Sequence, residues 1–307
     1  MLYPFIKILV RLALQIFCRE IHISGQKALT QPGPLLITAN HPNSFLDAII
    51  IGSIFSHPVH FLARGDAFKK PWHAKFLHIL NMIPVYRISE GKENLHLNEN
   101  AFLKCKEILS QNGIVLIFIE GICVHKHELQ PFKKGAARIA LENKGIHALK
   151  ILPLAIAYDS FTDFGKTVNI NICKPIPVAF LFPFNEEAKN TKHFNQCIFD
   201  QLQSNILIPT KQPSIKKQGK LLLLIPGLIG LIIHLPVYTL LKNFVHSKTK
   251  GTIFFDSVLF GLLLFSYPLF VLLISLVFLL CKISNIIVLI IFLLLPFTAW
   301  CAVKRRE

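Results

Sequence analysis

The stretch "NENAFLKCKEILSQNGIVLIFIEG", residues 98–121, decides the fold class because a helix pattern runs directly into a buried strand. Residues 98–113 are typical of a helix and end on Asn112–Gly113, which is a common C-terminal cap. Residues 114–121 open with a continuous apolar run, as expected of a strand covered on both faces. The pair predicts one repeat unit of an α/β sheet flanked by helices.

The same alternation extends to both sides of this stretch, over residues 20–208. Further strands are predicted at "EIHISG" (20–25), "PLLITAN" (34–40), "HFLAR" (60–64), "MIPVYR" (82–87), "LKILPLAIAY" (149–158) and "VNINICKPIPV" (168–178). Further helices are predicted over 67–81, 135–145 and 186–208. Strands that alternate with helices predict a sheet with helices on its faces.

The composition indicates a membrane-associated protein. Of the 307 residues 52% are apolar and only 16% are charged, which is unusual for a soluble chain. Residues 1–19 have apolar side chains at helical spacing, which fits an amphipathic helix on the membrane surface or a first helix packed on the core. A basic linker, residues 209–220, separates the predicted sheet domain from a hydrophobic region at 221–307.

The hydrophobic region contains three apolar blocks, residues 221–241, 253–280 and 286–303. The second and third blocks have the length needed to cross a bilayer, whereas prolines and glycines interrupt the first. Lysines and arginines cluster at 242–250 and 304–306, so the positive-inside rule favours a 253–303 hairpin with both ends on the cytoplasmic face. A topology with three membrane spans is the alternative. The sheet domain, which precedes the basic linker, is expected on the cytoplasmic face.

The net charge of +16 indicates an anionic partner. A basic domain beside an apolar region suits an anionic bilayer or a phosphate-bearing substrate, and no nucleic-acid-binding motif accompanies the charge. The seven cysteines are scattered without a C-x-x-C pair, which argues against a disulfide framework and a zinc site. We therefore expect no metal and no cofactor.

The segment "NHPNSFLD", residues 40–47, places His41 and Asp47 beside apolar sequence. One interpretation is a plain helix N-terminus; the other is a His–Asp dyad whose carboxylate prepares the imidazole to accept a proton. Three more blocks follow predicted strands or lie in them: "IPVYR" (83–87), "FIEGICVHKHELQPFKKGAARIA" (118–140) and "ILPLAI" (151–156). Together they supply a base, cations and a glycine-containing loop at the strand ends, where α/β enzymes place their sites.

In order and spacing these four blocks resemble the glycerolipid acyltransferase family, which includes glycerol-3-phosphate and lysophosphatidate acyltransferases. The resemblance covers residues 20–180 and implies that His41 is the general base and Asp47 its orienting partner. It also implies that Arg87 binds the phosphate of the acceptor. The other residues that it assigns to substrate binding or to ordering of the site are Ser44, Glu120, Gly121, Lys133 and Lys134.

The chain departs from the family pattern at two places. Five residues rather than four separate His41 from Asp47, and one more helical position would rotate a side chain by about 100°. We expect the extra residue to be accommodated in the turn before the helix starts. Ile122 and Cys123 stand where a hydroxyl residue and arginine are common, which leaves the acceptor open more than the reaction.

The sequence thus predicts acyl transfer from acyl-CoA or acyl carrier protein to a hydroxyl of glycerol-3-phosphate or lysophosphatidate in phospholipid synthesis. The acyl thioester is a co-substrate, and membrane lipids are the expected surroundings. One alternative is another acceptor, such as a lysolipid or a lipid with a non-phosphate head group. Another is a non-catalytic lipid-binding membrane protein with the same fold; a transporter is disfavoured because residues 253–303 contain few polar groups.

Overall fold

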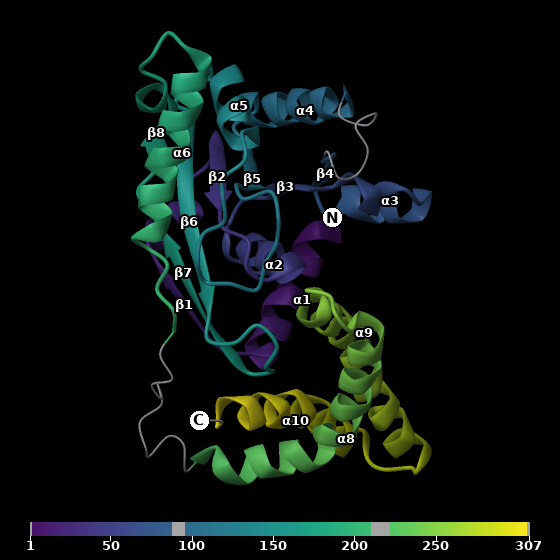
Figure 1. The fold of residues 1–307 in the computed structure, drawn as a ribbon. Helices are drawn as coiled ribbons and strands as arrows, with labels where there is room; N and C mark the ends of the chain where they lie inside the picture. Colours follow the sequence, from purple (N-terminus) through teal and green to yellow (C-terminus); the bar gives the residue numbers. More distant parts are fainter. Residues whose placement is uncertain (1, 88–95, 210–221, 306–307) are drawn as a thin grey trace.

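A computed structural model describes residues 2–87, 96–209 and 222–305, and it contains a mixed sheet with helices on both faces (Figure 1). All but the first residue of the predicted linker 209–220 lie outside these ranges. The sheet has eight strands in the order β1-β7-β6-β2-β5-β3-β4, with β8 pairing with β6. The predicted α/β sheet flanked by helices is confirmed.

The strands occupy the segments that the sequence predicts. They are β1 (Cys18–Ser24), β2 (Leu35–Ala39), β3 (Val59–Arg64), β4 (Met82–Val85), β5 (Ile114–Phe118), β6 (Lys150–Tyr158), β7 (Lys166–Ile172) and β8 (Ile176–Pro177). The segment predicted as one strand at 168–178 is two strands, β7 and β8, and both pair antiparallel with β6. Strands β2, β5, β3 and β4 run parallel to one another, so their carboxyl ends meet at one edge of the sheet.

Two hydrophobic clusters cover the two faces of the sheet. The helices of the sheet domain are α1 (Leu2–Phe17), α2 (Ser44–Ile54), α3 (Pro71–Ile79), α4 (Asn98–Ser110), α5 (Gly135–Glu142) and α6 (Glu187–Gln203). Side chains of α1 and α2 pack with Leu35 and Ile37 of β2, whereas α4, α5 and α6 pack with Leu36 on the other face. This alternation follows from the two-residue period of a strand. The predicted helix 186–208 ends at Gln203.

Helix α1 packs on the core through Val10, Leu14 and Phe17 and keeps other apolar side chains exposed. Lys7 donates to the carbonyl oxygen of Phe55, just beyond the last residue of α2, and Arg11 Nε donates to Ser53 O at 2.6 Å. The two cations therefore satisfy carbonyls at the end of α2, where the helix dipole favours positive charge. Apolar side chains on α1, including those of Phe5, Ile8 and Leu12, remain exposed.

Three further helices follow the sheet domain: α8 (Leu224–Thr249), α9 (Phe255–Leu280) and α10 (Asn285–Lys304). In the described part of the chain these three are long and apolar enough to cross a membrane. Their outward side chains are large and apolar; Ile232 and Leu280, for example, are 75% and 74% exposed. The first apolar block, predicted to be interrupted, forms one helix that continues through Pro236.

Helices α8 and α10 pack closely because α8 carries a glycine at the contact. A Cβ at Gly230 would lie 2.1 Å from the carbonyl oxygen of Thr298, so only glycine allows this approach. His234, one turn along α8, has its Nε2 3.1 Å from Leu295 O on α10. The small residue thus brings the helix backbones together, and the imidazole joins the same two helices.

The Gly230→Ala variant is expected to lower the thermal unfolding midpoint of the purified protein in detergent. The added methyl group meets backbone rather than a flexible side chain, so the helices must separate at a cost of about 1–3 kcal/mol. Gly261→Ala on α9 is the matched control, because a Cβ there meets nothing within 4 Å. Equal midpoints for the two variants would contradict this packing.

Candidate active site

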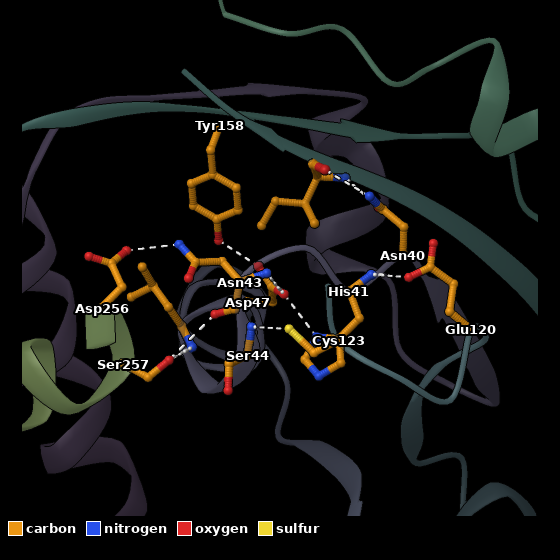
Figure 2. A network of polar contacts seen from close by, with 12 residues as sticks. Asn40, His41, Asn43, Ser44, Asp47, Glu120, Cys123, Tyr158, Asp256 and Ser257 are labelled. Carbon is orange, nitrogen blue, oxygen red and sulfur yellow. Dashed lines mark hydrogen bonds and ion pairs between the residues drawn. The ribbon is translucent and has the colours of Figure 1, made fainter. Parts of the chain in front are cut away.

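The residues between β2 and α2 form a turn that is attached to the middle of the sheet. Asn40 Nδ2 donates to Ile156 O at 2.9 Å, and Ile156 N donates to Asn40 Oδ1 at 2.8 Å (Figure 2). Ile119 N donates to Ala39 O at 3.0 Å, which adds a bond to the segment after β5. The turn therefore has a fixed position relative to β6 and β5, and His41 is held at the carboxyl edge of the sheet.

His41 and Asp47 are in contact, as the dyad hypothesis predicts. Nδ1 of His41 lies 2.8 Å from Oδ2 of Asp47, whose side chain is fully buried, while the His41 side chain is 14% exposed. The ring of Phe118 stacks on the imidazole with centroids 3.7 Å apart. Because Asp47 holds Nδ1, Nε2 is the ring nitrogen available to a substrate.

The buried Asp47 carboxylate receives hydrogen bonds from two further groups. Asn43 N donates to Oδ2 at 2.7 Å, and the Tyr158 hydroxyl donates to Oδ1 at 2.6 Å (Figure 2). Burial and the neighbouring carboxylate raise the pKa of Tyr158 well above its ordinary value, so the phenol stays protonated and donates. These bonds offset the desolvation of the carboxylate and orient it toward His41.

The extra residue between His41 and Asp47 is accommodated before the helix, as predicted. Helix α2 begins at Ser44, and Asn43 is its N-cap residue, so the added length lies in the turn. Ser44 has a φ of 52°, which is the left-handed region. This turn places Asp47 on the first turn of α2, facing back toward the imidazole.

Glu120 connects the loop after β5 to this turn. Its Oε2 accepts from His41 N at 3.1 Å, and its Oε1 accepts from Gln130 N at 3.0 Å. Burial raises the pKa of Glu120 above its ordinary value. Gly121 follows with a φ of +64°, and a Cβ there would lie 2.8 Å from Cγ of Lys133, so the Lys133 stem covers this glycine.

The remaining predicted site residues differ in how closely they approach this network. The backbone N of Ser44 donates to Sγ of Cys123 at 2.9 Å, and Ser44 itself is buried. Arg87, partly exposed after β4, is close enough for its charge to act on the Cys123 thiol. Lys133 and Lys134 are both exposed, and Lys134 is the N-cap residue of α5; in the described contacts it does not join the network.

Several members of the network were not among the residues predicted from sequence. They are Asn43, Tyr158, Asp256 and Ser257, which Figure 2 shows, and Lys166, which pairs with Asp256. Tyr158 ends a predicted buried strand. A polar side chain at the carboxyl end of such a strand is a sequence signal for a site residue. Asp256 lies near the start of an apolar block. Burying a carboxylate there costs desolvation free energy, so an acidic residue at this position indicates a specific role. Within the described ranges no three His, Cys, Asp or Glu side chains gather to hold a metal ion.

The Tyr158→Phe variant is expected to lower the free energy of unfolding by about 1–3 kcal/mol, because Asp47 Oδ1 loses its donor inside the protein. The measurement is thermal or denaturant unfolding of the purified protein. Tyr267→Phe is the matched control, since the buried Tyr267 hydroxyl makes no hydrogen bond within the described residues. Unchanged stability of Tyr158→Phe would mean that its hydroxyl does not hold Asp47.

Cys123 is expected to be chemically unreactive. Burial raises the pKa of its thiol to about 12, so almost no thiolate forms near neutral pH. The rate of Cys123 alkylation by iodoacetamide, followed by mass spectrometry, should rise steadily from pH 7 to pH 10. The exposed Cys281 serves as the comparison. A rate at pH 7 equal to that of Cys281 would show a reactive thiolate instead.

Comparisons with known proteins find similarity to acyltransferases. Residues 20–157 match the family model described as Acyltransferase. A lyso-ornithine lipid O-acyltransferase of Brucella abortus is 27% identical over 151 residues, which are 48% of this chain and 53% of that protein. The chain thus matches about half the length of this curated relative.

A solved structure, the 1-acyl-sn-glycerophosphate (LPA) acyltransferase PlsC from Thermotoga maritima, superimposes with a TM-score of 0.47 at 17% identity. The superposition covers 64% of this chain and 78% of the other.

Proposed function

We propose that the protein acylates a hydroxyl of glycerol-3-phosphate or lysophosphatidate, on the ground that residues 20–157 match the Acyltransferase family model and that the chain resembles the glycerolipid acyltransferases. The acyl donor is a thioester, acyl-CoA or acyl carrier protein. The observation that carries the proposal is the dyad: His41 is bound through Nδ1 to the buried Asp47, and its Nε2 is left for the acceptor.

In the proposed reaction His41 Nε2 takes the proton of the acceptor hydroxyl as the oxygen attacks the thioester carbonyl. The tetrahedral intermediate then expels the thiolate, and the imidazolium returns the proton to sulfur, so the products are an ester and a thiol. Asp47 fixes the tautomer and stabilises the imidazolium. The protonated Cys123 takes no part as a nucleophile, so no acyl-enzyme is required.

The cations around the dyad support an anionic acceptor. Arg87 binds the phosphate in this proposal, since a guanidinium matches phosphate oxygens with two parallel donors. Lys133, whose stem covers Gly121, adds positive charge beside the Glu120–Gly121 segment, and Lys134 contributes at longer range. Glu120 orders the site through its two backbone hydrogen bonds, and Ser44 through its bond to Cys123.

One observation favours a second acceptor, a lysolipid whose head group carries no phosphate. Ile122 and Cys123 are an apolar side chain and a neutral thiol at positions where the family commonly has a hydroxyl residue and arginine. The matched Brucella protein is described as acting on a lyso-ornithine lipid. The two acceptors share an acyl donor and a base, so they differ only at the head-group end of the site.

The C-terminal helices support a membrane-bound enzyme with the α9–α10 hairpin entering the bilayer. Asp256 at the start of α9 bonds to Asn43, and Lys304 at the end of α10 bonds to the carbonyl oxygen of Arg19. Both ends of the hairpin therefore lie at the sheet domain, and residues 281–284 lie at its far tip (Figure 1). With the basic ends retained on the cytoplasmic side, the acyltransferase domain faces the cytoplasm.

In this topology both ends of α8 lie on the cytoplasmic side, near the ends of the α9–α10 hairpin. Near its start, a Cβ at Gly227 would meet Arg305 Cδ at 2.6 Å; near its end, the rings of His246 and Phe255 lie 5.9 Å apart. Both of those neighbours, Arg305 and Phe255, flank the ends of the hairpin at the sheet domain. Pro236 lies between the two ends of α8, where a helix can bend.

Labelling of Cys281 tests this topology. Cys281 is exposed at the hairpin tip, so a variant that retains only this cysteine should react with a membrane-impermeant maleimide from the non-cytoplasmic side. A second variant with a single cysteine at Lys250, between α8 and α9, should react only from the cytoplasmic side. Labelling of Cys281 from the cytoplasmic side alone would show a hairpin that re-enters rather than crosses.

The experiment that tests the function is acyl transfer by membranes containing the wild-type chain or His41→Ala. Labelled acyl-CoA and acyl carrier protein are supplied with glycerol-3-phosphate, lysophosphatidate, a lysophospholipid and lyso-ornithine lipid in parallel. Loss of general-base catalysis lowers the rate by about 100- to 10,000-fold. Transfer to one acceptor that disappears in His41→Ala identifies the acceptor and the base.

Equal turnover by His41→Ala and the wild type would eliminate the dyad mechanism. Turnover restricted to lyso-ornithine lipid would favour the second acceptor. Absence of turnover on all four acceptors, beside an active control enzyme, would contradict the proposed function.

A further inference from the structure

We propose that the first turn of the apolar helix α9 is part of the apparatus that positions the dyad, with Asp256 and Ser257 as positioning residues and Lys166 as their support. This inference rests on the proposed function, since it assigns a role in the same reaction. It assigns to the C-terminal region a role besides membrane attachment.

Asn43 is the residue through which α9 reaches the dyad. Its backbone N donates to Asp47 Oδ2 at 2.7 Å, and its side-chain Nδ2 donates to Asp256 Oδ2 at 2.8 Å (Figure 2). Asn43 and Asp256 are both fully buried. Because one residue makes both bonds, the side-chain bond to Asp256 fixes the orientation of the amide that holds Asp47.

Ser257 acts on the same turn from the next position of α9. Its Oγ accepts from Leu46 N at 3.1 Å and lies 3.4 Å from Asn43 O, to which it donates. Leu46 N is among the first amides of α2 and donates to Asn43 O at 3.2 Å, so Ser257 Oγ is its second acceptor. Asn43 is the N-cap residue but makes no side-chain cap hydrogen bond, so Ser257 supplies a cap from a distant segment.

Lys166 makes the buried carboxylate of Asp256 tolerable. Its ammonium group pairs with Asp256 Oδ2, and both side chains are almost wholly excluded from solvent. The ammonium also lies 5.8 Å from the centroid of the Phe17 ring. An ion pair this deeply buried gives little net stability compared with apolar side chains of the same volume. Apolar side chains could anchor α9 equally well. The buried pair differs from them because Asp256 also accepts the hydrogen bond from Asn43.

Two double variants separate positioning from stability. K166M/D256N removes both charges but keeps an amide oxygen that accepts from Asn43; K166M/D256L removes both charges and the acceptor. Neither leaves an unpaired buried charge, so both are expected to fold. Asp256 and Ser257 touch the turn rather than a substrate, so the expected effect falls on kcat and leaves KM nearly unchanged.

We expect K166M/D256N to retain a kcat close to that of the wild type and K166M/D256L to lose about tenfold to a hundredfold, the scale of a misplaced catalytic group. Ser257→Ala should lower kcat as well. Its matched control is Ser275→Ala on the same helix, because the Ser275 hydroxyl bonds only to Val271 O of α9 in the described contacts. Ser275→Ala should have wild-type kcat.

A readout independent of turnover is the downfield proton resonance of the His41 Nδ1–H bonded to Asp47, assigned by its loss in His41→Gln. It should persist in K166M/D256N and shift or broaden in K166M/D256L. Absence of wild-type turnover would count against the proposed function alone, and the resonance would still decide the positioning role. Equal kcat and equal resonances in the two double variants would overturn the inference. If K166M/D256L does not fold, equal kcat for Ser257→Ala and Ser275→Ala would overturn it.

Discussion

The arrangement of the site depends on one buried negative charge, the carboxylate of Asp47. A carboxylate removed from water is stable only when hydrogen-bond donors surround it, and here an imidazole, a backbone amide and a phenol do so. The donors come from the turn after β2 and from the end of β6. The Asp47 carboxylate therefore links the turn, helix α2 and the sheet to one another. The same donors leave one ring nitrogen of His41 as the outward-facing group.

The sequence was sufficient for features that depend on local spacing. Hydrophobic period located the strand segments, because every strand must present its apolar side chains to a covering helix, but it did not separate β7 from β8. The position of α2 could also be predicted, since a one-residue insertion costs less in a turn than in a helix. What could not be predicted is that Ser44 adopts a φ of 52°, because the geometry of that turn is imposed by contacts with Cys123 and Asp47.

The unpredicted members of the site share a different property: each contacts a residue far away in the chain. Tyr158 is 111 residues from Asp47, and Asp256 is 213 residues from Asn43. Such contacts leave no periodic pattern, so only an unusual residue in an apolar context hints at them. The Pro and Gly residues in the first apolar block do not end its helix, which runs from Leu224 to Thr249. Gly230 permits close packing against α10 rather than ending the helix.

The apolar helices and the polar site meet in one helix, and this arrangement has a physical consequence. The first turn of α9 carries Asp256 and Ser257, buried in the polar network, whereas the helix continues as almost uninterrupted apolar sequence to Leu280. A fatty acyl thioester has the same division, with a water-soluble carrier joined to an apolar chain at the reacting carbonyl. A base positioned where a polar network becomes an apolar helix can reach that carbonyl while each part of the donor stays in its preferred surroundings. A long apolar helix fastened only through a flexible linker would hold the domain near the bilayer but would leave the distance between base and carbonyl variable. Hydrogen bonds from Asn43 and Leu46 to α9 remove that freedom, and under the proposed function they make the apolar helix and the dyad one unit.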